Sequence, residues 1–302
     1  MGFEKGLSPV ASDTFAASAK VLGPDTVLGG NVQEMPQTSM IGAGGRRFHV
    51  VRWHLGAGAE RHRPLLLLNG IGMNIELLAP LARSLPEREV IGIDMPGIGA
   101  SPDPVLPYTM PSMALTLATL LDRLDIAAVD ILGISWGGAL AQQFAFQHRA
   151  RTGRVVLAAT AAGATMVPGN PAMLAHLSDP REYTVERTLR RNLASIYNGG
   201  GSGKVSLNAA KAPSPLGFSY QMMAFAGWSS LPFLSLLDMP VMIMADEEDQ
   251  LVPPSNAHLL HNAIPGSRIE MFQGGGHLFM LSQRERFIEK LRPFLDEDIH
   301  RD

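Results

Sequence analysis

The stretch Val129-Asp130-Ile131-Leu132-Gly133-Ile134-Ser135-Trp136-Gly137-Gly138-Ala139-Leu140 decides the fold of this chain. An apolar, β-branched run leads into the pattern Gly-x-Ser-x-Gly, and small, helix-forming residues follow it. This order predicts a strand, an abrupt turn and a helix. The turn holds its central residue in a strained backbone geometry, and the flanking glycines lack the Cβ atoms that would clash there.

Ser135 is the predicted nucleophile. The strained turn lifts its hydroxyl clear of the sheet at the N-terminus of the helix. The backbone N–H of Trp136 then points to where negative charge forms when a carbonyl is attacked. Gly-x-Ser-x-Gly also arises by chance as an ordinary turn, but the strand before it and the helix after it favour the nucleophile.

The composition is that of an ordinary soluble globule with a large core. Of the 302 residues, 46% are hydrophobic and 18% are charged. The formal net charge of −3 gives no sign of a nucleic-acid-binding surface. Cysteine is absent, which excludes disulfides and thiolate metal sites and fits a reducing compartment.

The N-terminus has no apolar segment of the kind found in secretory signals, and no apolar run of the chain is long enough to cross a bilayer. We therefore expect a cytoplasmic protein without a membrane span. Residues 1–38 mix Gly, Pro, Ala, Ser and Thr without sustained periodicity. They are predicted to form an extension with little structure of its own.

Short apolar runs alternate with helical segments along most of the remaining chain. Strands are expected at residues 48–54, 63–68, 89–94, 129–134, 154–159, 239–245 and 268–272. Helices are expected at residues 74–85, 111–124, 136–148 and 256–263, with a closing helix from about residue 284. Fully apolar runs are typical of parallel strands buried on both faces. The pattern predicts an α/β fold with a doubly wound, mostly parallel sheet.

The alternation breaks between residues 160 and 237, where methionines, aromatics and short helical segments gather. Because this stretch lies between two sheet strands, it is predicted to form a helical cap over the carboxyl ends of the strands. The predicted organisation is an extension at 1–38, a core formed by 39–159 and 238–302, and a cap at 160–237.

A serine nucleophile needs a base and a carboxylate that orients the base, and this architecture supplies both from loops at the strand ends. The acidic run 246–249 follows a strand. We choose Asp249 because the loop must first clear the strand end and Leu251-Val252-Pro253 then anchors it, with Asp246 as the alternative. His277 lies on a glycine-rich loop after the last strand and is the predicted base.

The loop Asn69-Gly70-Ile71-Gly72 follows a buried strand and is expected to supply the second oxyanion donor through the Ile71 amide. Asn69 is left with two roles, a hydrogen bond within this loop or a contact to substrate.

The apolar side chains of the predicted cap are expected mostly to pack it onto the core. The others are expected to line an apolar channel above Ser135 that suits an aliphatic acyl group. The candidate substrate-binding residues are Asn69, Met166, Met222, Phe225 and Trp228.

Several other chemistries find no support in the sequence. Serine at position 135 excludes an aspartate nucleophile at the turn. No His/Asp/Glu cluster has metal-ligand spacing, and the glycine-rich segments do not match a phosphate-binding loop. No metal and no cofactor is expected.

Several further segments carry a resemblance to a known family. They are Leu68-Asn69-Gly70-Ile71-Gly72, Gly133-Ile134-Ser135-Trp136-Gly137-Gly138-Ala139-Leu140-Ala141-Gln142-Gln143-Phe144, Leu157-Ala158-Ala159-Thr160-Ala161-Ala162-Gly163, Met166-Val167-Pro168-Gly169, Phe225-Ala226-Gly227-Trp228 and Gly276-His277-Leu278-Phe279. With them the chain resembles the α/β-hydrolase superfamily. More narrowly, it is similar to intracellular medium-chain-length polyhydroxyalkanoate depolymerases, in which Asn replaces the more usual hydrolase His at position 69.

The resemblance implies hydrolysis of ester bonds in stored poly(3-hydroxyalkanoate) granules by Ser135, Asp249 and His277. The implied partner is a polyester granule or a small aliphatic ester, in the cytoplasm and in association with granules. Two features depart from the pattern of this family and are compatible with a different physiological ester. They are the long extension and the stretch 198–217, with its run of glycines. A general carboxylesterase, a C–C bond hydrolase and a non-catalytic granule-binding or ligand-sensing protein remain alternatives, and the oligomeric state is left open.

Overall fold

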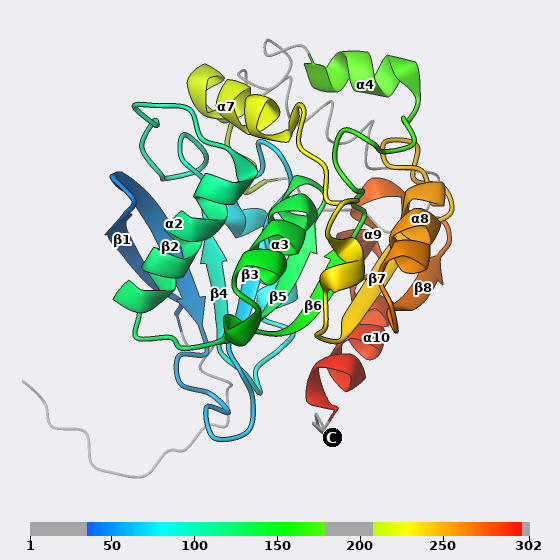
Figure 1. Ribbon diagram of the computed structural model, residues 1–302. Helices are drawn as coiled ribbons and strands as arrows, with labels where there is room; N and C mark the ends of the chain where they lie inside the picture. The colour runs from blue at the N-terminus through cyan, green and yellow to red at the C-terminus, as the bar shows by residue number, and fades with distance from the viewer. Residues whose placement is uncertain (1–34, 179–207, 298–302) are drawn as a thin grey trace, which may run out of the picture. The chain divides into compact units, whose positions relative to one another are not determined.

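The computed structural model describes residues 35–178 and 208–297. Most of the predicted extension and residues 179–207 of the predicted cap, with the glycine run at 199–203, lie outside the described residues. Within the described ranges one eight-stranded sheet has the strand order β1-β2-β4-β3-β5-β6-β7-β8 (Figure 1). β1 and β2 are antiparallel to their neighbours, and the other strands are parallel.

The strands are β1 (Gln37–Ala43), β2 (Arg46–Trp53), β3 (Leu65–Leu68), β4 (Val90–Ile93), β5 (Val129–Ile134), β6 (Thr152–Ala158), β7 (Val241–Asp246) and β8 (Arg268–Phe272). The α-helices are α1 (Ala79–Ala82), α2 (Met110–Arg123), α3 (Trp136–Gln147), α4 (Pro171–Ser178), α7 (Pro215–Phe225), α8 (Ser255–Ala263), α9 (Phe279–Ser282) and α10 (Arg284–Asp296). The described residues also form the 3₁₀ turns η1 (Ile75–Leu78), η2 (Arg149–Arg151), η3 (Leu234–Leu236) and η4 (Gly276–Leu278). The predicted α/β fold with a mostly parallel sheet is confirmed.

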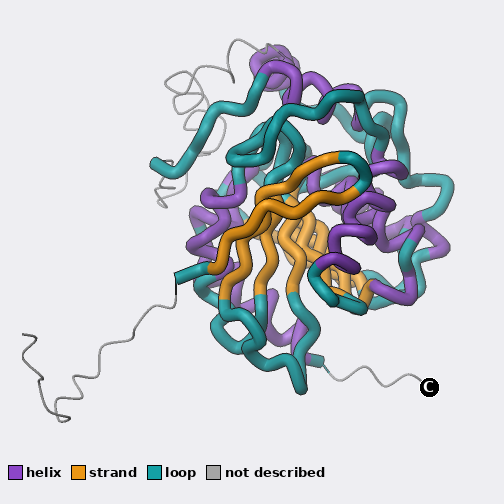
Figure 2. The backbone as a smooth tube through the Cα atoms, turned by 90° about the vertical axis from the view of Figure 1, so that its left-hand side faces the viewer, coloured by secondary structure: helices purple, strands orange, loops and turns teal. Residues whose placement is uncertain are grey.

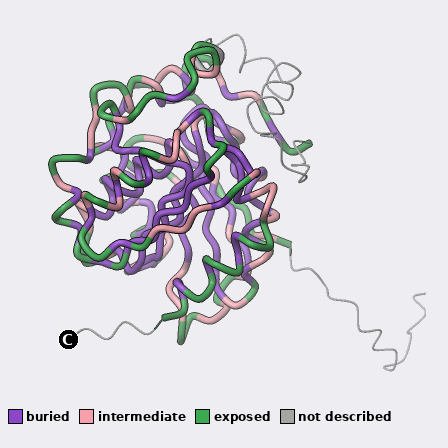
Figure 3. Tube along the Cα trace, turned by 90° about the vertical axis from the view of Figure 1, so that its right-hand side faces the viewer, coloured by how far each residue is buried: buried purple, intermediate pink, exposed green. Residues whose placement is uncertain are grey.

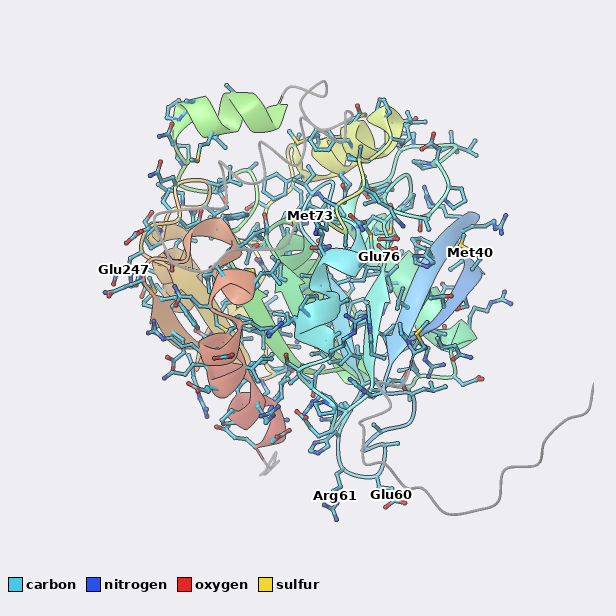
Figure 4. All side chains as sticks on the ribbon, turned by 180° about the vertical axis from the view of Figure 1, so that it is seen from behind. Met40, Glu60, Arg61, Met73, Glu76 and Glu247 are labelled. Atoms are coloured by element: carbon cyan, nitrogen blue, oxygen red, sulfur yellow. The ribbon has the colours of Figure 1, made fainter. Side chains whose placement is uncertain are left out.

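Helices cover both faces of the sheet. α2, α3 and α8 lie in front of it and α1, α9 and α10 behind it (Figures 1 and 4). Figure 2 shows the strands with helices on either side. All four leucines of β3 are fully buried. Since strand side chains alternate, Leu66 and Leu68 pack with the front helices, whereas Leu65 and Leu67 pack with the rear ones. Burial of each leucine contributes about 1.5–3 kcal/mol to the stability of the fold. Figure 3 shows that the buried residues are concentrated in the centre of the sheet and its covering helices.

The antiparallel edge of the sheet was not predicted. β1 and β2 are joined by Gly44 and Gly45, both at positive φ, as in a two-residue type I′ hairpin turn. Gln37 and Thr38 already belong to β1, so the extension ends earlier than the predicted residue 38.

The predicted helix at 74–85 is also divided. The segment forms η1 and then the short α1, with Pro80 in the first turn of α1. Proline has no N–H to donate to the carbonyl four residues earlier, so Pro80 disfavours one continuous helix through this position and suits the first turn of a new one. Among the helices of the described residues, none has the length and apolar character needed to span a bilayer.

Candidate functional site

Ser135 occupies the turn between β5 and α3, here called the elbow. Its backbone has φ 53° and ψ −118°, a conformation that few non-glycine residues adopt. Its amide donates to the Ala158 carbonyl at 2.9 Å, and the Thr160 hydroxyl donates to the Ser135 carbonyl at 2.7 Å. Bonds to β6 and to the residues that follow it therefore hold the elbow in its strained form.

The two glycines of the elbow have no space for a side chain. A Cβ on Gly137 would lie 2.1 Å from the carbonyl oxygen of Leu68. A Cβ on Gly133 would lie 2.5 Å from the carbonyl oxygen of Gly137. The close approach of strand, turn and helix thus explains why the sequence has glycine at both positions.

His277 and Asp249 form a buried pair at the same edge of the sheet. The His277 Nδ1 and Asp249 Oδ2 atoms are 2.7 Å apart, and the two side chains are 3% and 1% exposed. The other oxygen of Asp249 accepts the amides of Leu251 and Val252, each at 2.9 Å. These contacts fix the carboxylate, which in turn fixes the orientation of the imidazole.

Asp246, the alternative acid, has a different set of contacts. Its carboxylate accepts the amide of Glu248 at 3.0 Å and the amide of Gly275 at 2.9 Å. The second bond ties the end of β7 to the loop that carries His277. Asp246 therefore supports that loop, and Asp249 is the acid that contacts the imidazole.

The loop after β3 lies beside the elbow. A Cβ on Gly70 would be 3.6 Å from the Cβ of Ser135. Asn69 donates from Nδ2 to the Asn74 carbonyl at 2.8 Å and accepts the Gly70 amide at 2.9 Å. Asn69 thus makes the hydrogen bonds within its own loop that were the first of its two predicted roles.

The two predicted oxyanion donors belong to the loop after β3 and to the first residue of α3. Within residues 35–178 and 208–297, the backbone amides of Ile71 and Trp136 have no hydrogen-bond acceptor. Both residues line the cavity that Ser135 borders. This is the arrangement that an oxyanion hole requires, with two amides left for a ligand oxygen.

An apolar cavity of about 150 Å³ lies above Ser135. Its lining consists of Ile71, Ser135, Trp136, Thr160, Ala161, Met166, Leu174, Met222, Phe225, Leu251 and Val252. Because Leu251 and Val252 also bind Asp249, one small volume connects Ser135 with the loop of the His277–Asp249 pair. Sequence reasoning missed these two residues as lining, although their place directly after the acid was a usable signal.

Of the predicted substrate-binding residues, Met166, Met222 and Phe225 line the cavity, whereas Trp228 does not. The Trp228 indole N–H donates to Gln143 Oε1 at 2.6 Å, and its ring centroid lies 6.3 Å from that of Phe233. Trp228 therefore fastens the segment after α7 to α3. Aromatic composition alone cannot say which way a ring points, so the sequence could not indicate this contact with Gln143.

A group of ionisable residues that sequence spacing did not indicate lies near η1. The ligand-type atoms of His49, Glu76 and Asp94 all lie within 4.8 Å of one another. Asp94 accepts from His49 Nδ1 at 2.8 Å and from the Ile75 amide at 2.7 Å. The hydrogen bond to Asp94 raises the pKa of His49.

Glu76, labelled in Figure 4, is also fully bonded. Its oxygens accept from Asn74 Nδ2 at 2.7 Å and from Lys211 Nζ at 2.9 Å. Burial acts to raise the pKa of Glu76, but these two hydrogen bonds outweigh it and hold the pKa below its usual range. The group is a hydrogen-bond junction between β2, β4 and η1.

Comparisons with known proteins agree with the fold and with the resemblance found in the sequence. The sequence profile of the alpha/beta hydrolase fold family matches residues 63–283. A poly(3-hydroxyalkanoate) depolymerase from Ectopseudomonas oleovorans is 38% identical over 257 residues, which cover 83% of this chain and 90% of that protein.

Two solved structures share the architecture. An esterase from Exiguobacterium antarcticum has a TM-score of 0.74 at 23% identity, over 86% of this chain and all of that one. A meta-cleavage product hydrolase from Pseudomonas fluorescens has a TM-score of 0.70 at 23% identity, over 85% and 97% of the two chains. With the elbow, the parallel sheet and the family profile in agreement, this chain belongs to the α/β-hydrolase fold family.

Proposed function

We propose that this chain is a carboxylic ester hydrolase that cleaves aliphatic 3-hydroxyacyl esters and acts as an intracellular poly(3-hydroxyalkanoate) depolymerase. The observation that carries the proposal is a strained Ser135 on an apolar cavity whose lining also includes Leu251 and Val252, the residues that bind the carboxylate of the buried His277–Asp249 pair. The 38% identity to a poly(3-hydroxyalkanoate) depolymerase supports the choice of substrate class.

The first half of the reaction forms an acyl-enzyme. His277, oriented by Asp249, accepts the proton of the Ser135 hydroxyl as the serine oxygen attacks the ester carbonyl. The carbonyl oxygen becomes negatively charged and accepts hydrogen bonds from the Trp136 and Ile71 amides. The tetrahedral intermediate then collapses, and the proton on His277 passes to the departing alkoxide, which leaves as the alcohol end of the polymer.

The second half releases the acid. A water molecule gives its proton to His277 and attacks the acyl carbon, so a second tetrahedral intermediate forms against the same two amides. When this intermediate collapses, the proton returns to the Ser135 oxygen and the 3-hydroxy acid departs. Asp249 stays ionised throughout and stabilises the charged imidazole.

The cavity favours an aliphatic acyl chain. Met166, Met222 and Phe225 present apolar atoms beside Ser135, and they come from the described parts of the proposed cap at 160–237. Each methylene of the substrate's alkyl chain that moves from water into the cavity contributes about 0.8 kcal/mol of binding free energy, until the cavity is full. We therefore expect preference for acyl groups of medium length.

The first experiment measures turnover of 4-nitrophenyl alkanoates of increasing chain length by wild-type protein and by Ser135→Ala. Wild-type activity should peak at medium chain length, and Ser135→Ala should be inactive. Persistent hydrolysis by Ser135→Ala would refute the nucleophile. A sharp optimum at acetate would instead identify a small-ester carboxylesterase.

The second experiment uses the polymer itself. Wild-type protein incubated with a purified medium-chain polyester should release 3-hydroxy acids and should co-sediment with the granules. Ser135→Ala should co-sediment equally and release nothing. Failure of wild-type protein to react with a fluorophosphonate would favour the non-catalytic, granule-binding alternative.

A further inference from the structure

Helix α7 rests directly on the core loops that surround the elbow. The amide of Ser214, which caps α7, donates to the Gly97 carbonyl at 2.8 Å. One turn later the main chains nearly touch, since a Cβ on Gly217 would lie 2.6 Å from the Cα of Gly97. A Cβ on Gly72 would lie 3.1 Å from the Phe218 ring. α7 thus contacts two separate loops, one through its backbone and the other through the Phe218 ring.

Gln221 lies on the same helix and is 1% exposed. Its side-chain Oε1 accepts the amide of Gly72 at 2.8 Å. Its backbone carbonyl accepts the indole N–H of Trp136 at 2.9 Å. One buried residue therefore bonds both to the loop after β3 and to the first residue of α3.

These two bonds reach the two segments that carry the proposed oxyanion donors. Gly72 directly follows Ile71, and the Trp136 indole belongs to the residue whose amide follows Ser135. Oxyanion stabilisation depends on donors held within hydrogen-bond distance of the developing charge, and a misplacement of about 1 Å can cost about 100-fold in rate. The distance between the two amides consequently depends on the contacts that hold the loop after β3 and the start of α3 in place.

We propose that Gln221 is a positioning residue that sets the spacing of the Ile71 and Trp136 amides. Its neighbours on α7, Met222 and Phe225, line the acyl cavity, so the helix that contacts the substrate chain also holds the oxyanion donors. This inference rests on the proposed function, because the two amides matter only if an oxyanion forms between them.

The principal test is Gln221→Met, which keeps the length of the side chain and removes its acceptor oxygen. Freed of Gln221, the loop at Gly72 can shift, and kcat for a medium-chain 4-nitrophenyl ester should fall by about 10- to 100-fold with KM little changed. The rate of inactivation by an alkyl phosphonate should fall by a similar factor, since the phosphoryl oxygen occupies the same hole.

A second variant addresses the other bond. Trp136→Phe removes the indole N–H but keeps the backbone amide, and kcat should fall while KM holds. This variant carries the test if Gln221→Met does not fold, as judged by thermal melting.

Gln143→Met is the matched control. Gln143 is also buried and also accepts an indole N–H from the predicted cap region, that of Trp228, but it contacts neither donor segment. Its kcat should equal that of wild-type protein. A kcat for both Gln221→Met and Trp136→Phe within about twofold of the Gln143→Met value would overturn the inference, as would a change confined to KM.

The outcomes for Gln221 and for the proposed function are separable. If wild-type turnover disappears in Ser135→Ala and yet neither Gln221→Met nor Trp136→Phe lowers kcat, only the positioning role is lost. If Ser135→Ala retains wild-type turnover, the proposed function itself is wrong.

Discussion

Gly137 leaves no space for even one methyl group, because its missing Cβ would lie within 2.6 Å of the carbonyl oxygens of both Leu68 and Asn69. Those atoms belong to the main chain and cannot rotate away. We predict that Gly137→Ala lowers the free energy of unfolding by about 1–3 kcal/mol or more and removes esterase activity.

Urea unfolding measures this change. The control is Gly42→Ala on β1, where the nearest atom to an added Cβ is the Arg46 carbonyl oxygen at 3.9 Å. That variant should unfold at nearly the wild-type urea concentration. Equal destabilisation of the two variants would contradict the steric explanation.

The two aspartates of the acid loop should differ sharply in their effect on rate. Asp249→Asn places an amide or a neutral oxygen against His277 Nδ1, so the imidazole loses the partner that sets its tautomer. We predict a fall in kcat of about 10³- to 10⁴-fold. Asp246→Asn keeps an oxygen for the Gly275 amide and should lose much less.

Steady-state kinetics on one chromogenic ester measures both variants. If Asp246→Asn proves the more damaging of the two, the acid has been misassigned. Comparison at several pH values guards against a simple shift of the pH optimum.

At the residue scale, the sequence predicted much of the candidate site but did not indicate the residues that hold its segments in place. Ser135 and His277 are predictable because each lies in a short glycine-rich motif directly after a strand. Gln221 is not, because a single glutamine within an apolar helix gives no sign of what its oxygen will meet. The bond between Trp228 and Gln143 could not be predicted either, because the two residues are distant in the sequence.

At the scale of elements, His49 links β2 to the end of β4 through Asp94. The hydrogen bond to Asp94 raises the pKa of His49, with burial and the distant Lys211 opposing and Glu76 assisting. A raised pKa means that the folded chain holds the proton more tightly than the unfolded one. The stabilisation is complete below about pH 6.5 and disappears as the pH rises through the folded-state pKa.

We predict that the difference in unfolding free energy between wild-type protein and His49→Gln is largest near pH 6 and shrinks toward pH 9. Gln keeps a donor for Asp94 but cannot become charged. Urea titrations at several pH values measure the difference. A difference that grows as the pH rises would show that the charge on His49 does not stabilise the fold.

Strands were predicted correctly where both of their faces are buried, as in β3 and β5. Such strands have mostly apolar sequences, which makes them easy to recognise. β1 escaped prediction because its sequence, Gln37-Thr38-Ser39-Met40-Ile41-Gly42-Ala43, is mostly exposed and has no clear alternation. Its pairing is fixed by the Gly44-Gly45 turn and by β2. The segment predicted as one helix is divided into η1 and α1 near Pro80, whose missing N–H favours a helix start at this position.

At the scale of the whole sheet, the two ends have different tasks. The candidate site gathers at the carboxyl ends of the strands, below α4 and α7, whereas charged side chains such as Glu60 and Arg61 mark the opposite end (Figure 4). There the fully buried Arg88 donates to Asp130 Oδ2 at 3.2 Å and also pairs with Asp296. Burial raises the pKa of Asp130.

We predict that Arg88→Met lowers the free energy of unfolding by about 3–5 kcal/mol, because Asp130 stays buried after losing its ion-pair partner. The folded fraction should keep its kcat, since the change lies at the end of the sheet away from Ser135. Chemical unfolding combined with active-site titration measures both quantities.

The control is Arg292→Met, which breaks the more exposed ion pair between Arg292 and Glu87 and should cost about 1 kcal/mol or less. A small loss for Arg88→Met would indicate that Asp130 becomes neutral or finds another partner.

The contact of Gly217 with Gly97 has a consequence for how this scaffold could acquire new substrates. Where Gly217 meets Gly97 no side chain separates the two main chains, so no substitution of a contacting side chain can lower this part of α7 toward the core. We therefore expect natural or directed evolution of substrate preference to act on the side chains that α7 presents to the cavity, above all Met222 and Phe225. Substitutions there can change the accepted alkyl length while the backbone of α7 keeps its position.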